Sequence, residues 1–509
     1  MTFARIALSS SLLLLFTLAG GLAGGLTGCS ACTAPPGGEG EGEGQAGEGE
    51  GEGEGEGQAG EGEGEGEGQP PTPRLIVGGG AGDGAINGTL FVHVVDDQTG
   101  DPVVGVFVRV EPPNGGGNNI EHQTDAAGLA TFTDPAVVGA QDVTVHGAAV
   151  VHTSWLGIDA VNITVPVPVL ATTPGAPESG TADLRIPGID AIVLSGGADY
   201  VNVIANQSDT RNLGDPANAL DDFVGLRCST HPLANGVGTP PQCSSGFTMT
   251  TRTGAIAIEA TIVQMEDHGT VNPADDTVVG VRTYAIARNL TIVANATTGA
   301  NLTIIGDNDL TNATLNFPAA APAGLGTIGA FVAIDVGDEG VLVTTLFRLN
   351  DNVHVVPALT GSLAGTSYQI VAIAQPNGGG VKQSASLLYT LADVSSVTVP
   401  EWLFPPANIN VTSGGLHVVY GASAGAAVNS LEIRAAGAGT GPSEWGAAVF
   451  DGRTTVVLPT LADDPIATGA HACKVTAIDS PAFDPASFTF SDVVATLARL
   501  AEDASQFTK

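Results

Sequence analysis

The motif with the most direct chemical meaning is Gly421-Ala422-Ser423-Ala424-Gly425, which matches the pattern G-x-S-x-G. In that pattern a sharp turn after a strand exposes a serine hydroxyl, and a histidine activates it for nucleophilic attack. A strand is expected just before the motif, over Leu416–Tyr420, and Asp463 or Asp464 and then His471 follow in the required chain order. Ser423 is therefore the candidate nucleophile of a serine hydrolase.

The chain around Ser423 argues against that reaction. An α/β-hydrolase needs helices that alternate with parallel strands, and the chain before the motif shows no helical period. Only 84 residues follow Gly425, and in a sequence with 71 glycines the pattern arises easily by chance. A Gly/Ser hairpin turn is the simpler interpretation, so we do not expect an enzyme.

Short acidic loops are the next candidates, because carboxylate and amide oxygens are the ligands that calcium prefers. The loops are Asp307-Asn308-Asp309, Asp335 with Asp338-Glu339, and Asn350-Asp351-Asn352. Asp and Asn are also the commonest turn residues, because their side chains bond to the nearby backbone. A structural calcium ion is kept as an alternative, and no other cofactor is expected.

The nine histidines and three tryptophans are scattered along the sequence. No two histidines are two or four residues apart, so no metal-binding pair is expected, and most are expected at the surface or in turns. Trp155, Trp402 and Trp445 could form a platform that stacks on sugars. A single Trp in each sandwich is, however, more typical of a hydrophobic core.

Beyond residue 30 the chain has four cysteines, Cys32, Cys228, Cys243 and Cys473. Cys228 and Cys243 flank a loop rich in Pro, Gly and Asn, and a disulfide that closes it would stabilise the fold by about 3 kcal/mol. We predict this disulfide for an exported protein, with two buried free thiols as the alternative. The roles of Cys32 and Cys473 are left open.

Residues 1–28 have the features of a secretion signal. Arg5 precedes the apolar stretch Ile6–Leu18, which is shorter than a membrane span. The segment ends in Leu26-Thr27-Gly28-Cys29, which resembles the lipobox of bacterial lipoproteins. The resemblance implies cleavage before Cys29 and acylation of its thiol and new amine, and Ser30 in place of Asp implies the outer membrane. An ordinary secretion signal with a chance Cys is the alternative.

Residues 29–85 are predicted to be a disordered, acidic, Gly-rich tether. Residues 37–69 alternate Glu and Gly almost without interruption, and the 12 Glu between Glu39 and Glu67 have no basic neighbour. Such a segment has no apolar face to bury, and its like charges repel one another. It would hold a folded body away from an anionic membrane.

The whole chain of 509 residues carries a net charge of −37, from 53 acidic and 16 basic residues. Without the 12 linker Glu and Arg5 the charge is −26. A protein this acidic does not neutralise phosphates, so a nucleic-acid partner is excluded.

The chain after residue 85 reads as all-β, a row of antiparallel β-sandwiches. Runs of Val, Ile, Thr and Phe recur between clusters of Gly, Pro, Asn and Asp. Strands are expected at Leu90–Val95, Val103–Val110, Leu129–Phe132, Gln141–Val145 and Val161–Val169. A short C-terminal helix is expected over Ser491–Leu500, where Val493, Val494, Leu497 and Leu500 have helical spacing.

The stretch VVDDQTGDPVVGVFVRVEP, followed by TDAAGLATFTD and VTVHG, resembles the carboxypeptidase regulatory-like domain. The resemblance covers Ile86–Leu170, with Val106 where Ala is usual, and implies a transthyretin-like β-sandwich over residues 86–172 with a structural or binding role. No polar cluster is expected to face inward in this module.

Two regions follow the first module. Residues 181–399 are β-rich and form one or two domains, with strands expected at Ala285–Val293, Gly329–Ile334, Gly340–Arg348, Val353–Pro357 and Tyr368–Ala374. Residues 400–509 resemble a generic immunoglobulin-like or fibronectin-like sandwich, with strands at Leu416–Tyr420, Ser430–Arg434, Trp445–Phe450 and Thr454–Leu458.

These features predict a lipid-anchored cell-envelope protein, an outer-membrane lipoprotein that faces the cell surface or the periplasm. Its β-sandwiches would serve a structural, adhesive or binding role, with an envelope protein or a glycan as partner. The first alternative is a periplasmic or surface module that binds carbohydrate or protein, and the second is the serine hydrolase that uses Ser423.

Overall fold

The computed structural model describes most of the chain after residue 70, namely residues 71–113, 119–170, 179–194, 198–208, 228–229, 246–266, 277–344, 348–349, 351–377, 381–412, 417–435, 443–466, 468–481 and 483–509. The predicted signal peptide, Cys29 and the Glu-Gly repeat lie outside the described residues. Strands dominate the described chain, which confirms the all-β prediction. Among the described residues no helix is long and apolar enough to cross a membrane.

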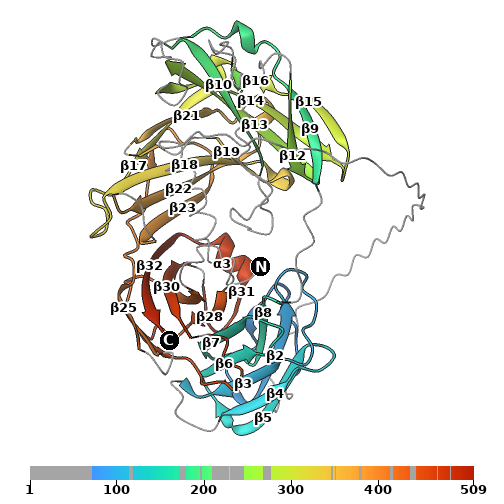
Figure 1. Ribbon diagram of the computed structural model, residues 1–509, viewed down its shortest axis with the longest axis vertical. Coiled ribbons are helices and arrows are strands. Elements are labelled where there is room, and N and C mark those ends of the chain that lie inside the picture. Colours follow the sequence, from blue (N-terminus) through green and yellow to red (C-terminus); the bar gives the residue numbers. More distant parts are fainter. Residues whose placement is uncertain are drawn as a thin grey trace, which may run out of the picture.

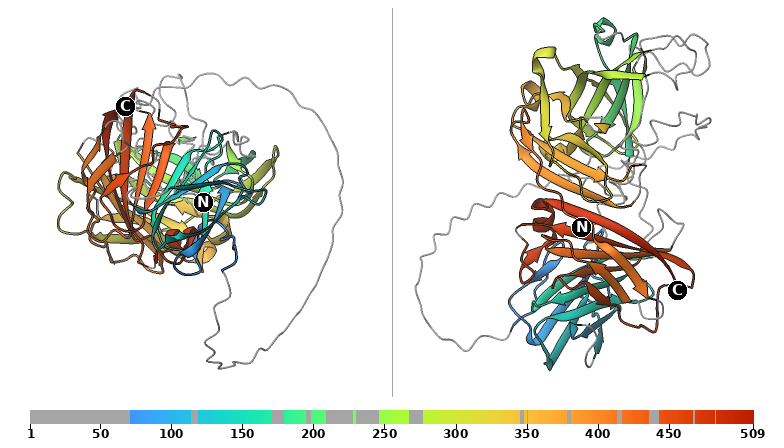
Figure 2. Two further views of the ribbon diagram at one scale, coloured as in Figure 1. Left: turned by 90° about the horizontal axis from the view of Figure 1, so that it is seen from below. Right: turned by 90° about the vertical axis from the view of Figure 1, so that its left-hand side faces the viewer.

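The body has two lobes, which Figures 1 and 2 show stacked along the long axis. The lower lobe in Figure 1 combines residues 71–170 with the C-terminal residues from 407 onward, and the upper lobe contains the segment between them. The first and last parts of the chain therefore lie side by side.

The first sandwich of the lower lobe lies within residues 71–170. Most of its strands coincide with runs rich in Val and Ile. Its strands are β1 (Gly80–Gly82), β2 (Asn87–Asp96), β3 (Phe107–Glu111), β4 (Ile120–Gln123), β5 (Leu129–Val138), β6 (Gln141–His146), β7 (His152–Ile158) and β8 (Asn162–Val167). Val92, Phe132, Val145 and Ile163 are fully buried between the two layers. The expected strand Val103–Val110 begins later, at Phe107, because Gly105 turns the chain with a φ of 77°.

Ordered structure starts before the predicted end of the tether at residue 85. Ile76 is buried, and β1 pairs with both β8 and β31 (Phe488–Thr489). The backbone amide of Arg74 donates to Asn162 Oδ1 at 2.8 Å. The last residues of the predicted tether thus belong to the first sandwich, because Ile76 supplies apolar surface that the Glu-Gly repeat lacks.

The upper lobe has two separate hydrophobic cores, each between two sheets. The strands around the first core are β9 (Ser179–Arg185), β10 (Tyr200–Gln207), β11 (Cys228–Ser229), β12 (Phe247–Arg252), β13 (Gly254–Glu266), β14 (Thr277–Ile292), β15 (Thr297–Asn301) and β16 (Thr303–Ile304). Those around the second are β17 (Leu310–Asn316), β18 (Thr327–Asp335), β19 (Val341–Val343), β20 (Arg348–Leu349), β21 (Val353–Pro357), β22 (Ser367–Gln375), β23 (Gln383–Leu391) and β24 (Val397–Thr398).

The C-terminal sandwich completes the lower lobe. Its strands are β25 (Ala407–Thr412), β26 (His417–Gly421), β27 (Val428–Ala435), β28 (Ser443–Val449), β29 (Thr455–Val457), β30 (Ala470–Asp479) and β32 (Arg499–Thr508). The sheet β25-β26-β29 covers β27, β28 and β30, with Leu431, Trp445 and Val475 buried between them.

One sheet of 13 strands runs through both lobes in the order β19-β18-β22-β23-β32-β30-β27-β28-β7-β6-β3-β4, with β20 beside β18. The lobes are joined where β23 pairs with β32, from Gln383↔Glu502 to Ser386↔Arg499. The first and C-terminal sandwiches are joined where β28 runs parallel to β7, from Trp445↔His152 to Val449↔Leu156. The domain borders stay a prediction, and the structure adds that backbone pairing crosses two of them.

The C-terminal tail differs in part from the predicted helix over Ser491–Leu500. Helix α3 spans only Phe490–Ala495, and from Arg499 the chain forms β32, the ten-residue strand between β30 and β23. Leu497 and Leu500 are buried as the periodicity indicated, but Leu500 is buried as part of a strand.

Candidate functional site

The predicted lipid and disulfide residues lie largely outside the described chain. Cys29, Cys32 and Cys243 are not among the described residues, and Cys228 lies in β11, where its backbone pairs with Val203. The disulfide between Cys228 and Cys243 stays a prediction. Cys473 is a buried free thiol in β30. Its burial raises the pKa of the thiol to about 12, so the thiol stays protonated and unreactive near neutral pH.

The residues that a Ser423 hydrolase would need do not come together. Ser423 is buried, and its hydroxyl has no hydrogen-bond partner among the described residues. His471 Nδ1 lies 2.8 Å from Glu444 Oε2, and Asp463 contacts His146. Asp464 pairs with Lys509. Each candidate partner is therefore engaged elsewhere.

The acidic loops and the tryptophans have structural roles in the described chain. Asp307 pairs with Arg282, and Asp309 accepts a hydrogen bond from Thr360 at 2.9 Å. Among the described residues no cluster of three or more His, Cys, Asp and Glu side chains has a metal-binding arrangement. The three tryptophans are all buried, so the sugar-stacking platform is wrong and the core assignment holds.

Several histidines are buried, contrary to the expectation of surface or turn positions. His93, His146, His152, His354 and His471 are each at most 9% exposed. His146 and His152 end β6 and begin β7, and their rings lie 5.8 Å apart between centroids. Their spacing of six residues gave no signal in the sequence, because only the hairpin between β6 and β7 brings them together.

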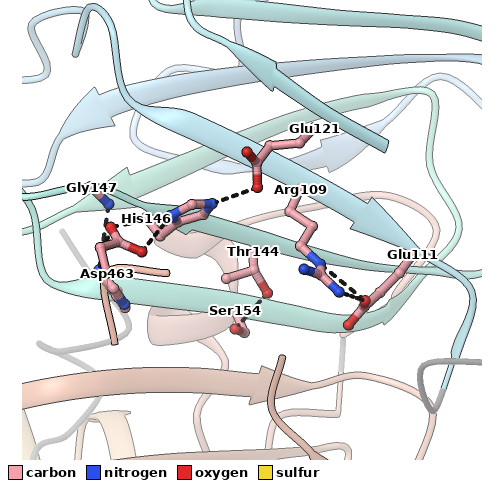
Figure 3. A network of polar contacts seen from close by, with 9 residues as sticks. Arg109, Glu111, Glu121, Thr144, His146, Gly147, Ser154 and Asp463 are labelled. Atoms are coloured by element: carbon pink, nitrogen blue, oxygen red, sulfur yellow. Dashed lines mark hydrogen bonds and ion pairs between the residues drawn. The ribbon is translucent and has the colours of Figure 1, made fainter. Parts of the chain in front are cut away.

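His146 lies between two carboxylates from different parts of the chain (Figure 3). Its Nε2 is 3.0 Å from Glu121 Oε2 in β4, and its Nδ1 is 3.0 Å from Asp463 Oδ1 in the loop after β29. Both contacts are hydrogen bonds only when both ring nitrogens carry a proton. His152 Nε2 also lies 3.4 Å from Asp463. This group ties the first sandwich to the C-terminal one and contradicts the expectation of no inward polar cluster.

A second polar contact joins the same two sandwiches. Asp142 in β6 is buried, and both of its oxygens accept from Arg453, at 2.7 and 2.9 Å. The backbone amide of Gly157 also donates to Asp142, at 2.8 Å. Arg453 further binds Asp451. The bidentate geometry fixes the loop after β28 against β6 and β7.

The upper lobe contains a buried acid, Glu259 in β13. Thr261 Oγ1 donates to Glu259 Oε1 at 2.7 Å, whereas Glu259 Oε2 and the neighbouring Asn206 Oδ1 both lack a partner. Burial raises the pKa of Glu259 to about 8, so near neutral pH the carboxyl keeps its proton. A protonated carboxyl can donate to Asn206 and satisfy both atoms.

A β-bulge in β14 is the most unusual backbone feature of the upper lobe. The register with β13 shifts by one residue between Ile256↔Leu290 and Ile258↔Ala287, so the bulge contains Arg288 and Asn289. Asn289 has a φ of 58°, a left-handed conformation that few residues with a side chain adopt. Buried Glu339 holds it, accepting from the Asn289 amide at 2.6 Å and from Arg288 Nε at 2.7 Å.

The bulge opens onto a cavity of about 600 Å³ where the two sandwiches of the upper lobe meet. We call it the bulge cavity. Its walls are the end of β14, the segment from β15 to Asp309, and the loop after β21. The lining residues are Ile286–Leu290, Gly299–Asn301, Thr303–Gly306, Asp309, Ala358 and Thr360–Ser362. The lining residues come from three separate segments of the chain, and of these only Asp309, in the acidic loop Asp307–Asp309, was marked by a sequence motif.

Comparisons with known proteins assign no family. No family model and no curated protein sequence match the chain. Matches among solved structures include the Bacillus anthracis TIE protein (10% identity, TM-score 0.13, 61% of this chain and 49% of that one). They also include the pilus adhesin SpaC from Lactobacillus rhamnosus GG (11%, 0.14, 74% and 44%) and two B repeats of the collagen-binding protein of Staphylococcus aureus (10%, 0.11, 77% and 95%). The chain spans less than half the length of the first two structures, and TM-scores this low support no functional transfer.

Proposed function

We propose that the chain is a lipid-anchored cell-envelope protein whose β-sandwich body has a structural, adhesive or binding role and no catalytic activity. The observation that carries the proposal is the sheet of 13 strands, which links the first sandwich, the C-terminal sandwich and the upper lobe by backbone hydrogen bonds. A lipidated cysteine and a self-repelling Glu-Gly tether would precede this body. The tether would then hold the body away from the membrane as a single rigid unit.

The arrangement of the hydrolase candidates supports the non-enzymatic part of the proposal. Ser423 is buried, and His471 and Asp463 are bound to other side chains. A fluorophosphonate probe that labels the wild-type protein but not Ser423→Ala would show that the non-enzymatic assignment is wrong.

The anchor is tested by replacing Cys29 with Ala in cells fed a clickable palmitate analogue. The matched control is Cys32→Ala, which removes a thiol three residues away and leaves the lipobox intact. We expect Cys29→Ala to lose the label and leave the membrane fraction, while Cys32→Ala keeps both. Equal labelling of wild type and Cys29→Ala would rule out lipidation at Cys29.

The orientation is tested by adding protease to whole cells that express the wild-type protein. Cleavage within the Glu-Gly tether on intact cells, at the same rate as in lysed cells, would place the body at the surface. Protection that disappears only after the outer membrane is opened would place it in the periplasm.

The bulge cavity favours the binding form of this role over a purely structural one. It is large enough for a small ligand, and its wall is a bulge held by an ion pair between Arg288 and buried Glu339.

A further inference from the structure

We propose that the bulge cavity is a binding site for a neutral saccharide of a few sugar units. The inference deepens the binding form of the proposed function and rests on it. Four features carry it: a fixed wall, one strained backbone position, the lack of an available charge for an ion among the described lining residues, and a lining that mixes free amides and hydroxyls with aliphatic carbon.

The wall of the cavity is fixed before any ligand arrives. Arg288 uses its guanidinium to bind Glu339 and two carbonyl oxygens, that of Val336 at 3.0 Å and that of Ser362 at 2.9 Å. The Ser362 contact ties the loop after β21 to the bulge in β14. A binding wall that is already ordered saves the entropy that ordering it would cost.

One backbone position in an unusual conformation lies at this cavity. Asn289 has a φ of 58°, which a residue with a side chain seldom adopts, whereas the φ of 56° at Gly361 is ordinary for glycine. Strained positions and β-bulges persist where the surrounding structure holds them, and they concentrate at ligand sites. Here the buried Glu339 does the holding at Asn289 through a 2.6 Å hydrogen bond.

The charges at the cavity disfavour ions. Arg288 spends its hydrogen bonds on Glu339 and on carbonyl groups, so it offers an anion little, and exposed Asp309 would repel one. A divalent cation would need several carboxylates, yet among the described lining residues Asp309 is the only acidic one.

The remaining lining suits a neutral, hydroxyl-rich molecule. The side chains of Asn289, Asn301 and Thr303 are exposed and make no hydrogen bonds with described residues, so they are available as donors and acceptors. Ile304 and Leu290 add aliphatic carbon against which the C–H face of a sugar can pack. The described lining residues include no aromatic ring, so we expect a weak affinity, with a Kd of about 1 mM.

The test measures saccharide binding to the purified full-length protein in dodecylphosphocholine, a detergent that has no sugar headgroup. Saturation-transfer NMR titrations use the neutral probes cellotriose, maltotriose and chitotriose, with sialyllactose as the anionic probe. We expect at least one neutral trisaccharide to bind the wild-type protein and sialyllactose to bind no better.

The decisive variant is Asn289→Gly, which keeps the left-handed backbone and removes the whole side chain with its amide. Its control is Asn295→Gly, because Asn295 is also exposed and has a φ of 56° but does not line the cavity. We expect Asn289→Gly to weaken binding by about tenfold and Asn295→Gly to leave it unchanged. Asn301→Ala, which leaves the bulge intact, should weaken binding by about threefold.

Three results would overturn the inference: no binding of any neutral trisaccharide, equal affinities of wild type and Asn289→Gly, or binding of sialyllactose alone. Palmitate labelling at Cys29 is read on the same preparations. Loss of saccharide binding with labelling intact would remove the cavity proposal and leave the anchor. Loss of labelling with saccharide binding intact would remove the lipid anchor and leave the cavity proposal.

Discussion

The protein joins neighbouring sandwiches in two different ways. In the lower lobe the first and C-terminal parts of the chain pair in two sheets: β7 with β28 in the sheet of 13 strands, and β1 with β31 in a sheet of five strands. In the upper lobe no strand pairing among the described residues joins the two sandwiches. Side chains do so instead: Asn206 donates to the Val343 carbonyl at 2.9 Å and Tyr284 to that of Val355 at 2.6 Å.

This difference distinguishes the lower junction, which is made by backbone pairing, from the upper junction, which is made by side-chain contacts. The lower junction is filled by the ring of Trp155 against those of Phe450 and Phe490. A junction made by side chains can leave space between the sheets, and the bulge cavity lies there. The comparison predicts that the lower junction dominates stability and that the upper one responds to its surroundings.

The largest effect is expected at the lower junction, from Arg453→Met. The change leaves the buried carboxylate of Asp142 without its bidentate partner and should lower the free energy of unfolding by about 3–5 kcal/mol. The control is Arg74→Met, because Arg74 and Asp83 form an ion pair whose side chains are 58% and 38% exposed. That change should cost less than about 1 kcal/mol. Chemical denaturation measures the free energy of unfolding of both variants. Equal losses in the two variants would refute the prediction that the lower junction dominates stability.

A smaller effect, dependent on pH, is expected at the upper junction from Glu259. Its pKa is raised from 4.5 in the unfolded chain to about 8 in the fold, so the folded state binds the extra proton between these values. This stabilising contribution is complete below pH 4.5 and is lost as the pH rises toward 8, at up to about 1.4 kcal/mol per pH unit.

Glu259→Gln should remove that part of the pH dependence and make the protein more stable at pH 7, by about 2 kcal/mol. Glu401→Gln is the control, because Glu401 is exposed. Denaturation from pH 5 to pH 8 compares the slopes. If the free energy of unfolding falls with pH at the same slope in wild type and in Glu259→Gln, the carboxyl of Glu259 is not protonated in the folded protein.

The smallest effect is expected from Asp463→Asn, which weakens the contacts with His146 and His152 while the strand pairing stays. Because the Asp463 side chain is 33% exposed, the expected cost is about 1 kcal/mol. Asp464→Asn is the neighbouring control, since its ion pair with Lys509 lies nearer the surface, and it should cost less. Thermal denaturation compares the two, and a larger cost for Asp464→Asn would contradict the role of the histidine cluster.

The strands themselves could be predicted from the sequence, because their signal is local. Val353–Pro357 was expected as a strand and is β21 to the residue. Strand β32 was missed because it carries Glu502 into the interior, where Lys474 and Gln383 contact it. A charged residue on a buried face is acceptable only once those partners are in place, and they come from other strands.

The sites could not be predicted, because their residues meet only through the fold. Trp445 Nε1 donates to Ser154 at 3.0 Å across a sequence separation of 291 residues. His146 and Asp463 are similarly far apart in the chain, and the bulge cavity draws on three segments. The motif that did stand out, around Ser423, is local, and Ser423 itself is buried between exposed turn residues.

Native-state hydrogen exchange on the full-length protein tests the central claim, that the first and C-terminal sandwiches form one cooperative unit. The amides of β6 and β28 are followed across a denaturant series, in the wild type and in Trp155→Ala. We predict one opening free energy and one denaturant slope for both strands, and an equal fall in both on Trp155→Ala. If β28 opened at a lower free energy while β6 stayed protected, the shared sheet would not make them a single unit.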